Sequence, residues 1–166
     1  MKDRNDASGN WIKEQISDFI AASPENTMAD NTGQPAWDLA LTGFSSGADP
    51  IWQQYKEYIG AFHWTPWEIY SQYHPEHPAR PDELAVISWV LPQRRRVRKA
   101  NRSCSRYPAP EWARTRVYGE ELHSVLRSSL VQSLQEAGCP AVSPMLAPNW
   151  TYLKSQRFSY ASTWSE

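Results

Sequence analysis

The strongest constraint on the fold of this chain lies in residues 83–138, which pass from an apolar run to a basic tract and then to an amphipathic helical pattern. An apolar run, LAVISWVL at residues 84–91, opens the segment, and Pro92 closes the run. Because polar and apolar residues do not alternate in it, the run is typical of a strand that is buried on both faces. We therefore expect a buried strand here, in a sheet that helices cover.

A basic tract, RRRVRK at residues 94–99, comes directly after this strand. It belongs to a longer stretch, residues 94–116, with nine Arg or Lys and a single acid, Glu111. The net charge of the whole chain is only −1, so any attraction to a polyanion must be local. The position behind a strand favours a cationic folded loop, and a localisation signal is the alternative interpretation.

The clearest helical pattern covers residues 117–137, with Gly138 at the position that often follows a helix end. At about 100° per residue, Leu122 lies in an apolar stripe that runs along this helix. His123 falls inside the stripe, and Glu121 falls at its other edge. On a purely structural interpretation, His123 is a hydrogen-bonded core residue. Glu121 would then be an acid that stabilises the positive end of the helix dipole.

Weaker patterns fill the rest of the chain. We expect a helix at residues 11–22 capped by Ser8 or Asn10, a strand at 37–44, a helix at 50–59 capped by Asp49, and a short strand at 141–146. Residues 25–35 and 60–81 are expected loops, and the second of them is rich in aromatic residues, proline and histidine.

The order of these elements indicates an α/β fold. We expect a small central sheet of about three or four strands flanked by helices, with long aromatic and proline-rich loops. Nine Trp and thirteen Pro in 166 residues favour such ordered loops. The expected division is an N-terminal helix and polar linker at 1–34, followed by one α/β domain at 35–166.

Histidines and cysteines give little sign of a metal site. His63, His74 and His77 lie close together in the aromatic loop, but their spacing matches no known ligand set, so we interpret them as solvated or stacked side chains. Cys104 and Cys139 are far apart and are expected as two reduced thiols, with a single disulfide as the alternative. Two cysteines are too few for a four-cysteine iron–sulfur cluster.

The chain carries no recognisable membrane or export segment. No stretch approaches the roughly 18–20 apolar residues that a membrane-spanning helix needs. The charged N-terminus, MKDRND, has no apolar stretch after it and does not look like a secretory signal. We expect a cytoplasmic protein without membrane association.

Several short runs resemble the N-terminal part of epoxyqueuosine reductases, which are related to the reductive dehalogenases. The similar runs are LAVISWVLP at 84–92, SRY at 105–107, ELH at 121–123 and VLRSSL at 125–130, together with the expected strand at 37–44. In that family a buried strand ending in proline precedes an Arg-Tyr element, and an Asp-Tyr-His triplet then opens a helix. The resemblance spans residues 35–166 and supports the same α/β expectation.

This resemblance implies an oxidoreductase that uses cobalamin and two 4Fe-4S clusters, which in the family pass electrons to the cobalt. The acid of the triplet, thought to protonate the substrate, corresponds to Glu121, and the triplet histidine corresponds to His123. Arg106 and Tyr107 match the Arg-Tyr pair, which would line the cofactor or substrate. Tyr118, in the first turn of the expected helix, would border the cofactor as well.

The sequence departs from the family pattern at several positions. Glu121 stands where the family has Asp, Leu122 stands where it has Tyr, and the interval between Tyr107 and Glu121 is longer. These differences imply a divergent branch that acts on something other than queuosine-tRNA. A ferredoxin domain follows in the family, so we expect an N-terminal fragment or subunit that is inactive alone. Its expected partners are a ferredoxin-like domain or chain and a tRNA or another nucleotide-bearing substrate.

A second hypothesis requires no cofactor. Residues 94–116, with Tyr107, Trp112 and Tyr118, combine cations and aromatic rings as surfaces that hold nucleic acid or an acidic protein do. The chain would then be a non-catalytic binding module. Salt-sensitive RNA binding would favour this hypothesis, whereas a corrin absorbance after incubation with cobalamin would favour the reductase. A hydrolase has the least support, because no metal-ligand run or phosphate loop is present.

Overall fold

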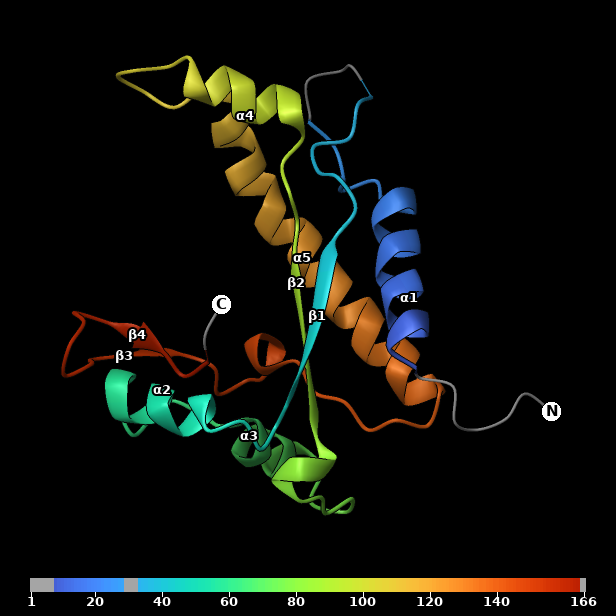
Figure 1. Cartoon of the computed structure of the whole chain (residues 1–166), viewed down its shortest axis with the longest axis vertical. Coiled ribbons are helices and arrows are strands. Elements are labelled where there is room, and N and C mark those ends of the chain that lie inside the picture. The colour runs from blue at the N-terminus through green and yellow to red at the C-terminus, as the bar shows by residue number, and fades with distance from the viewer. Residues whose placement is uncertain (1–7, 29–32, 165–166) are drawn as a thin grey trace. The chain divides into compact units, whose positions relative to one another are not determined.

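The computed structural model describes residues 8–28 and 33–164 (Figure 1). The charged N-terminus and part of the expected loop at 25–35 lie outside the described residues. Within them the chain is a mixed α/β protein, which confirms the expected fold class. Its elements are α1 Gly9–Ala22, β1 Leu41–Ser46, α2 Ile51–Ile59, α3 Pro66–Tyr73, the 3-10 helix η1 Pro81–Glu83, β2 Ala85–Val90, α4 Arg95–Arg102, α5 Pro110–Glu136, the 3-10 helix η2 Pro144–Leu146, β3 Tyr152–Leu153 and β4 Ala161–Ser162.

The described strands form two small antiparallel sheets, where the sequence suggests one central sheet. β1 pairs with β2, and β3 pairs with β4. The chain folds as two compact units, each made of separate segments. The first unit contains the described residues up to 42 together with 89–130, and the second contains 43–88 and 131–164.

The first helix of the first unit follows the sequence prediction closely. The Ser8 side chain accepts a hydrogen bond from the backbone N–H of Trp11 at 3.3 Å, so Ser8 is the N-cap. The three isoleucines of α1 are buried at helical spacing: Ile12, Ile16 and Ile20. After the helix, the Asn26 amide oxygen accepts from the backbone N–H of Trp37 at 3.0 Å. This bond fixes Trp37, which is 4% exposed, in the core of the unit.

The apolar run at 84–91 forms strand β2, but its expected burial on both faces is wrong. Residues 85–90 of β2 are exposed or half-buried, and Val90 is 62% exposed, whereas Leu91 after the strand is buried. Within residues 8–28 and 33–164, β2 pairs with one strand, β1, and its other edge has no strand beside it. β1 begins at Leu41, later than expected, because Trp37 pairs only in an isolated bridge with Gln93.

The basic tract is helical, which corrects the expectation of a loop. Helix α4 begins at Arg95, directly after the N-cap Arg94. Val97 is fully buried and anchors the helix in the first unit. One apolar residue among cations makes no repeating apolar pattern, so the sequence could not distinguish a short helix from a loop here.

Helix α5 is longer than predicted at its N-terminal end. It begins at Pro110, well before the expected start at 117, because the fixed φ and missing N–H of proline suit the first helical position. The other end is as expected, since Gly138 adopts φ +81°. The backbone N–H of Gly138 bonds to the carbonyl of Gln135, and that of Cys139 bonds to Leu134, which closes the helix with a Schellman motif.

The second unit contains a helix that the sequence pattern did not reveal. α3 lies within the expected loop at 60–81, and Thr65 and Glu68 form a capping box at its start. α2 lies where the sequence predicts a helix, but its N-cap is Pro50 and not the expected Asp49. The Asp49 carboxylate accepts a hydrogen bond from the backbone N–H of Ile51 at 2.9 Å. The expected strand at 141–146 is wrong: η2 forms there instead, because proline at its start has no N–H for a sheet ladder.

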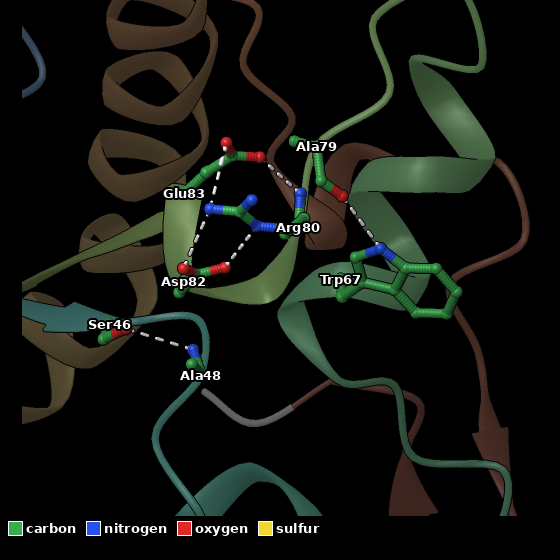
Figure 2. A network of polar contacts seen from close by, with 7 residues as sticks. All are labelled: Ser46, Ala48, Trp67, Ala79, Arg80, Asp82 and Glu83. Atoms are coloured by element: carbon green, nitrogen blue, oxygen red, sulfur yellow. Dashed lines mark hydrogen bonds and ion pairs between the residues drawn. The ribbon is translucent and has the colours of Figure 1, made fainter.

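Figure 2 shows how the second unit fixes the turn before β2. The Arg80 guanidinium donates to both oxygens of Asp82 at 3.0 and 3.2 Å, and its backbone N–H donates to Glu83 at 2.8 Å. Gly47 approaches this turn so closely that a Cβ there would lie 2.8 Å from the Leu84 Cβ and 2.8 Å from the Pro81 carbonyl oxygen. Only glycine fits between the end of β1 and η1 without displacement.

Every helix in the described ranges, 8–28 and 33–164, is too short or too polar to cross a bilayer. The two thiols, Cys104 and Cys139, are free.

Candidate functional site

The two central residues of the reductase hypothesis lie on α5 but point in different directions. Leu122 is fully buried between them. Glu121 is exposed, whereas His123 is half-buried. Two positions along a helix differ by about 200° in direction, so Glu121 and His123 project to opposite sides of α5.

His123 is held by a contact that sequence spacing did not reveal. The indole N–H of Trp89 donates to His123 Nδ1 at 3.1 Å, and the two rings stack with centroids 6.4 Å apart and planes 27° apart. Because an indole N–H only donates, the imidazole accepts through Nδ1 and carries its proton on Nε2. The Trp89 side chain therefore fixes the tautomer of His123.

The other three predicted site residues lie in two places. Arg106 and Tyr107 belong to the loop between α4 and α5, and the Arg106 guanidinium carbon lies 5.4 Å from the centroid of the Tyr107 ring. Both side chains are exposed, Tyr107 to 71%. Tyr118 is half-buried on α5, in the turn before Glu121.

These positions do not make the walls of one pocket for a macrocycle. A cofactor site is usually a concave, mostly apolar cavity with a few converging polar groups. The first unit has a cleft of about 280 Å³, but other residues form it, among them Ile20, Trp37 and Arg94. With Glu121 in solvent and His123 on the other side of the helix, these residues do not fit a corrinoid.

The three histidines of the second unit occupy separate environments. His63 is 2% exposed and stacks on Trp164, with ring centroids 6.4 Å apart. Burial lowers the pKa of His63, since the charged imidazolium is poorly solvated there, and the nearby Lys56 acts in the same direction. His74 Nε2 lies 3.0 Å from the Ala141 carbonyl oxygen. Across residues 8–28 and 33–164, no three His, Cys, Asp or Glu side chains cluster closely enough to hold a metal.

The most prominent charged surface of the first unit is a row of cations on α4. At about 100° per residue, Arg95, Lys99 and Arg102 fall within about 60° of one another, and Arg98 lies about 40° further round. All four are exposed, and Val97 occupies the opposite, buried side of the helix. We call these four residues, Arg95, Arg98, Lys99 and Arg102, the α4 stripe.

The cations of the α4 stripe have no carboxylate counterions among the described residues. In the part of the chain that the structure describes, none of the four lies within ion-pair distance of a carboxylate. Two cations close to them in sequence do have partners: Arg94 pairs with Asp38 and Arg116 pairs with Glu120, each at 3.4 Å. The lack of partners therefore belongs to the stripe itself rather than to every arginine in the region.

The stripe destabilises the helix that carries it. Its members stand three or four positions apart, which brings like charges together and costs about 0.2–0.5 kcal/mol for each neighbouring pair. Arg95 also places a positive charge at the positive end of the helix dipole. Such an arrangement becomes favourable when an external anion lies along the stripe.

The sequence predicted a basic region here but not this surface. Val97 was the residue that could have revealed it. A helix that exposes cations three and four positions apart needs an apolar residue on its opposite side, and Val97 has that position in α4. Comparisons with protein-family models, with curated proteins and with solved structures found no match to this chain. The candidate function therefore rests on the residues and geometry described above.

Proposed function

We propose that this chain is a non-catalytic binding module that uses the α4 stripe to bind the phosphate backbone of a nucleic acid. The observation that supports this function is the row of four exposed cations that lack carboxylate partners within the described residues. A folded protein gains nothing from such a row, because like charges at this spacing repel one another. Phosphates supply the missing countercharge and release condensed counterions when they bind.

The dimensions of the stripe suit a sugar–phosphate backbone. From Arg95 to Arg102 the helix rises about 10 Å, which corresponds to about three phosphate-to-phosphate steps, and therefore about four phosphates, along one strand of a duplex. Three of the four cations are arginine, whose planar guanidinium binds phosphate oxygens in a bidentate manner. The net charge of −1 for the whole chain confines the attraction to this surface.

An acidic protein is the competing partner for the same charges. Carboxylates on a flexible polypeptide would also neutralise the stripe, but they lack the regular spacing of phosphates. Binding to polyglutamate and binding to an oligonucleotide of similar charge therefore separate the two partners. We expect the oligonucleotide to bind more tightly.

The test is a fluorescence-anisotropy titration of a labelled oligonucleotide with the full chain at low salt. Lys99→Gln removes one charge of the stripe and should weaken binding several-fold. Lys154→Gln removes an equally simple charge from an exposed position in the second unit and should leave Kd unchanged. Equal effects of the two substitutions, or no binding by the wild-type chain, would contradict the proposed function.

As an alternative function we propose, on sequence resemblance alone, that the chain is the N-terminal part of a cytoplasmic reductase that needs a ferredoxin-like partner. The runs at 84–92 and 105–107 are its support. In this alternative a corrinoid would have to bind away from Glu121 and His123, since these two residues do not share a pocket. Incubation of the chain with cobalamin followed by gel filtration should then leave corrin absorbance on the protein, and absorbance only in the small-molecule fraction would end this proposal.

A further inference from the structure

The loop that follows α4 is fixed to the end of that helix. The Asn101 amide oxygen accepts a hydrogen bond from the backbone N–H of Ala109 at 3.0 Å, and the Asn101 carbonyl accepts from Cys104 at 3.1 Å. Ala109 itself is 2% exposed. Both ends of the loop are therefore bound to one residue in the last turn of α4, and Figure 1 shows the loop extending beyond this helix before the chain enters α5.

Tyr107 is presented to solvent by this loop. It stands two positions before Ala109, so its backbone lies within about 7 Å of that buried residue. Its ring is 71% exposed, and the Arg106 guanidinium lies over it at 5.4 Å from the centroid. Pro108 restricts the backbone of Tyr107 to extended conformations, which lowers the entropy lost when the ring is used in binding.

We propose that the ligand of this surface is a single-stranded nucleic acid, with a base stacked on the Tyr107 ring while its phosphates lie along the α4 stripe. This inference rests on the proposed function, since it takes the stripe as the phosphate site. The exposed Tyr107 ring is carried by the loop that follows the α4 stripe, and aromatic rings combined with cations hold single strands without strict sequence preference.

A duplex or an acidic protein would use only half of this surface. In a duplex the faces of the bases are covered by their neighbours, so a base cannot stack on Tyr107 unless it is flipped out. A polyglutamate chain has no planar group that could stack on the ring. A single strand offers both phosphates and accessible base faces, because its bases can be splayed out.

Three probes of the same length separate these contributions in an anisotropy titration of the full chain. The probes are a single-stranded oligonucleotide, the blunt duplex that contains it, and an abasic strand with the same number of phosphates. We expect the single strand to bind about fivefold or more tightly than either of the other probes, which is the lower range for one stacked base.

Substitutions at Tyr107 test the ring directly. Tyr107→Ala should weaken single-strand binding by about five- to a hundredfold, and Tyr107→Phe should retain most of the affinity, since stacking needs the ring and not the hydroxyl. Tyr160→Ala is the matched control, because Tyr160 is also 71% exposed but lies in the second unit. On the abasic strand, Tyr107→Ala should have no effect.

The outcomes distinguish this inference from the proposed function. Equal binding of single strand and duplex, together with a harmless Tyr107→Ala, would overturn the stacking proposal while the phosphate site stands. Polyglutamate that binds as tightly as the single strand would assign the surface to an acidic protein and overturn it as well. No binding of any probe by the wild-type chain would overturn both proposals.

Discussion

The paired cations of the second unit and the α4 stripe of the first unit have opposite surroundings. In the second unit, Lys56 forms an ion pair with Glu68 at 2.5 Å, and Arg80 pairs with Asp82 and Glu83 (Figure 2). In the first unit, the α4 stripe places four cations in solvent without a carboxylate partner among the described residues. Charges that a fold has already neutralised serve the fold, whereas charges left in one row are available to another molecule.

Aromatic side chains differ in their surroundings as well. In the second unit the Trp52 and Trp164 rings stack with centroids 5.8 Å apart, and the His63 ring stacks on Trp164 with centroids 6.4 Å apart. In the first unit, Tyr107 is exposed and the Arg106 guanidinium lies over its ring. The second unit has exposed rings as well, Tyr160 among them, so Tyr107 is distinguished by its place on the loop that follows the α4 stripe.

Neutralising all four cations of the α4 stripe should have the largest effect, because it removes the difference in charge between the stripe and the paired cations of the second unit. The fourfold variant with glutamine at the stripe positions should lose about a hundredfold or more in affinity for an oligonucleotide, because four phosphate contacts disappear together. Its helical circular dichroism should match the wild type, since all four side chains are exposed. Retained affinity in a folded variant would exclude the stripe as the phosphate site.

The packed turn of the second unit should respond next most strongly. Gly47→Ala places a Cβ 2.8 Å from both Leu84 and Pro81 atoms, and we expect unfolding to become about 1–3 kcal/mol easier in urea titrations. Gly43→Ala is the control, because nothing lies within 4 Å of a Cβ at that position. Similar unfolding midpoints for both variants would show that the turn is not tightly packed.

The buried histidine should make folding stability depend on pH. Burial lowers the pKa of His63, with Lys56 contributing, while the Ser162 carbonyl and Glu68 oppose the shift. The unfolded chain therefore binds the proton first as the pH falls below about 6.5, and stability is lost from there down to the lowered pKa of the folded state. Urea unfolding at several pH values should show this slope.

His63→Gln should flatten this acid-side slope, whereas His77→Gln, at an exposed position, should leave it in place. An identical slope in the wild type and in His63→Gln would assign the pH dependence to other groups.

The smallest expected effects come from single members of the stripe. Arg95→Gln removes a cation from the positive end of the α4 dipole together with its repulsion by Arg98 and Lys99, so we expect a stability gain of about 0.5–1 kcal/mol at low salt. Arg102→Gln relieves similar repulsion but loses a favourable position at the other end of the dipole, and should change stability less. Equal gains, or a loss for Arg95→Gln, would contradict this account of the stripe.

The sequence predicted those elements whose ends and faces are marked by single residues. Ser8 marked the start of α1, Gly138 marked the end of α5, and the apolar run at 84–91 located β2. Burial could not be predicted in the same way, because the number of strands that pair with β2 depends on distant parts of the chain. A strand pattern without alternation indicates a strand but does not determine what covers it.

The sequence predicted which residues of the candidate site are basic, but it did not predict how they are arranged on a surface. The cations at 94–102 were evident, but with Val97 as the buried residue the segment lacked the periodic apolar pattern from which helices are recognised. The partner of His123 was equally hidden, since Trp89 lies in β2, far away in sequence. Only the fold brings a strand residue and a helix residue into one hydrogen bond.

The salt dependence of oligonucleotide binding tests the central claim most directly. If the four cations of the α4 stripe each displace counterions from a phosphate, the slope of log K against log salt should be about 3 units less steep in the fourfold glutamine variant than in the wild type. The two chains would be titrated with the same single strand across a range of salt concentrations. A slope that is unchanged by the loss of all four charges would contradict the account.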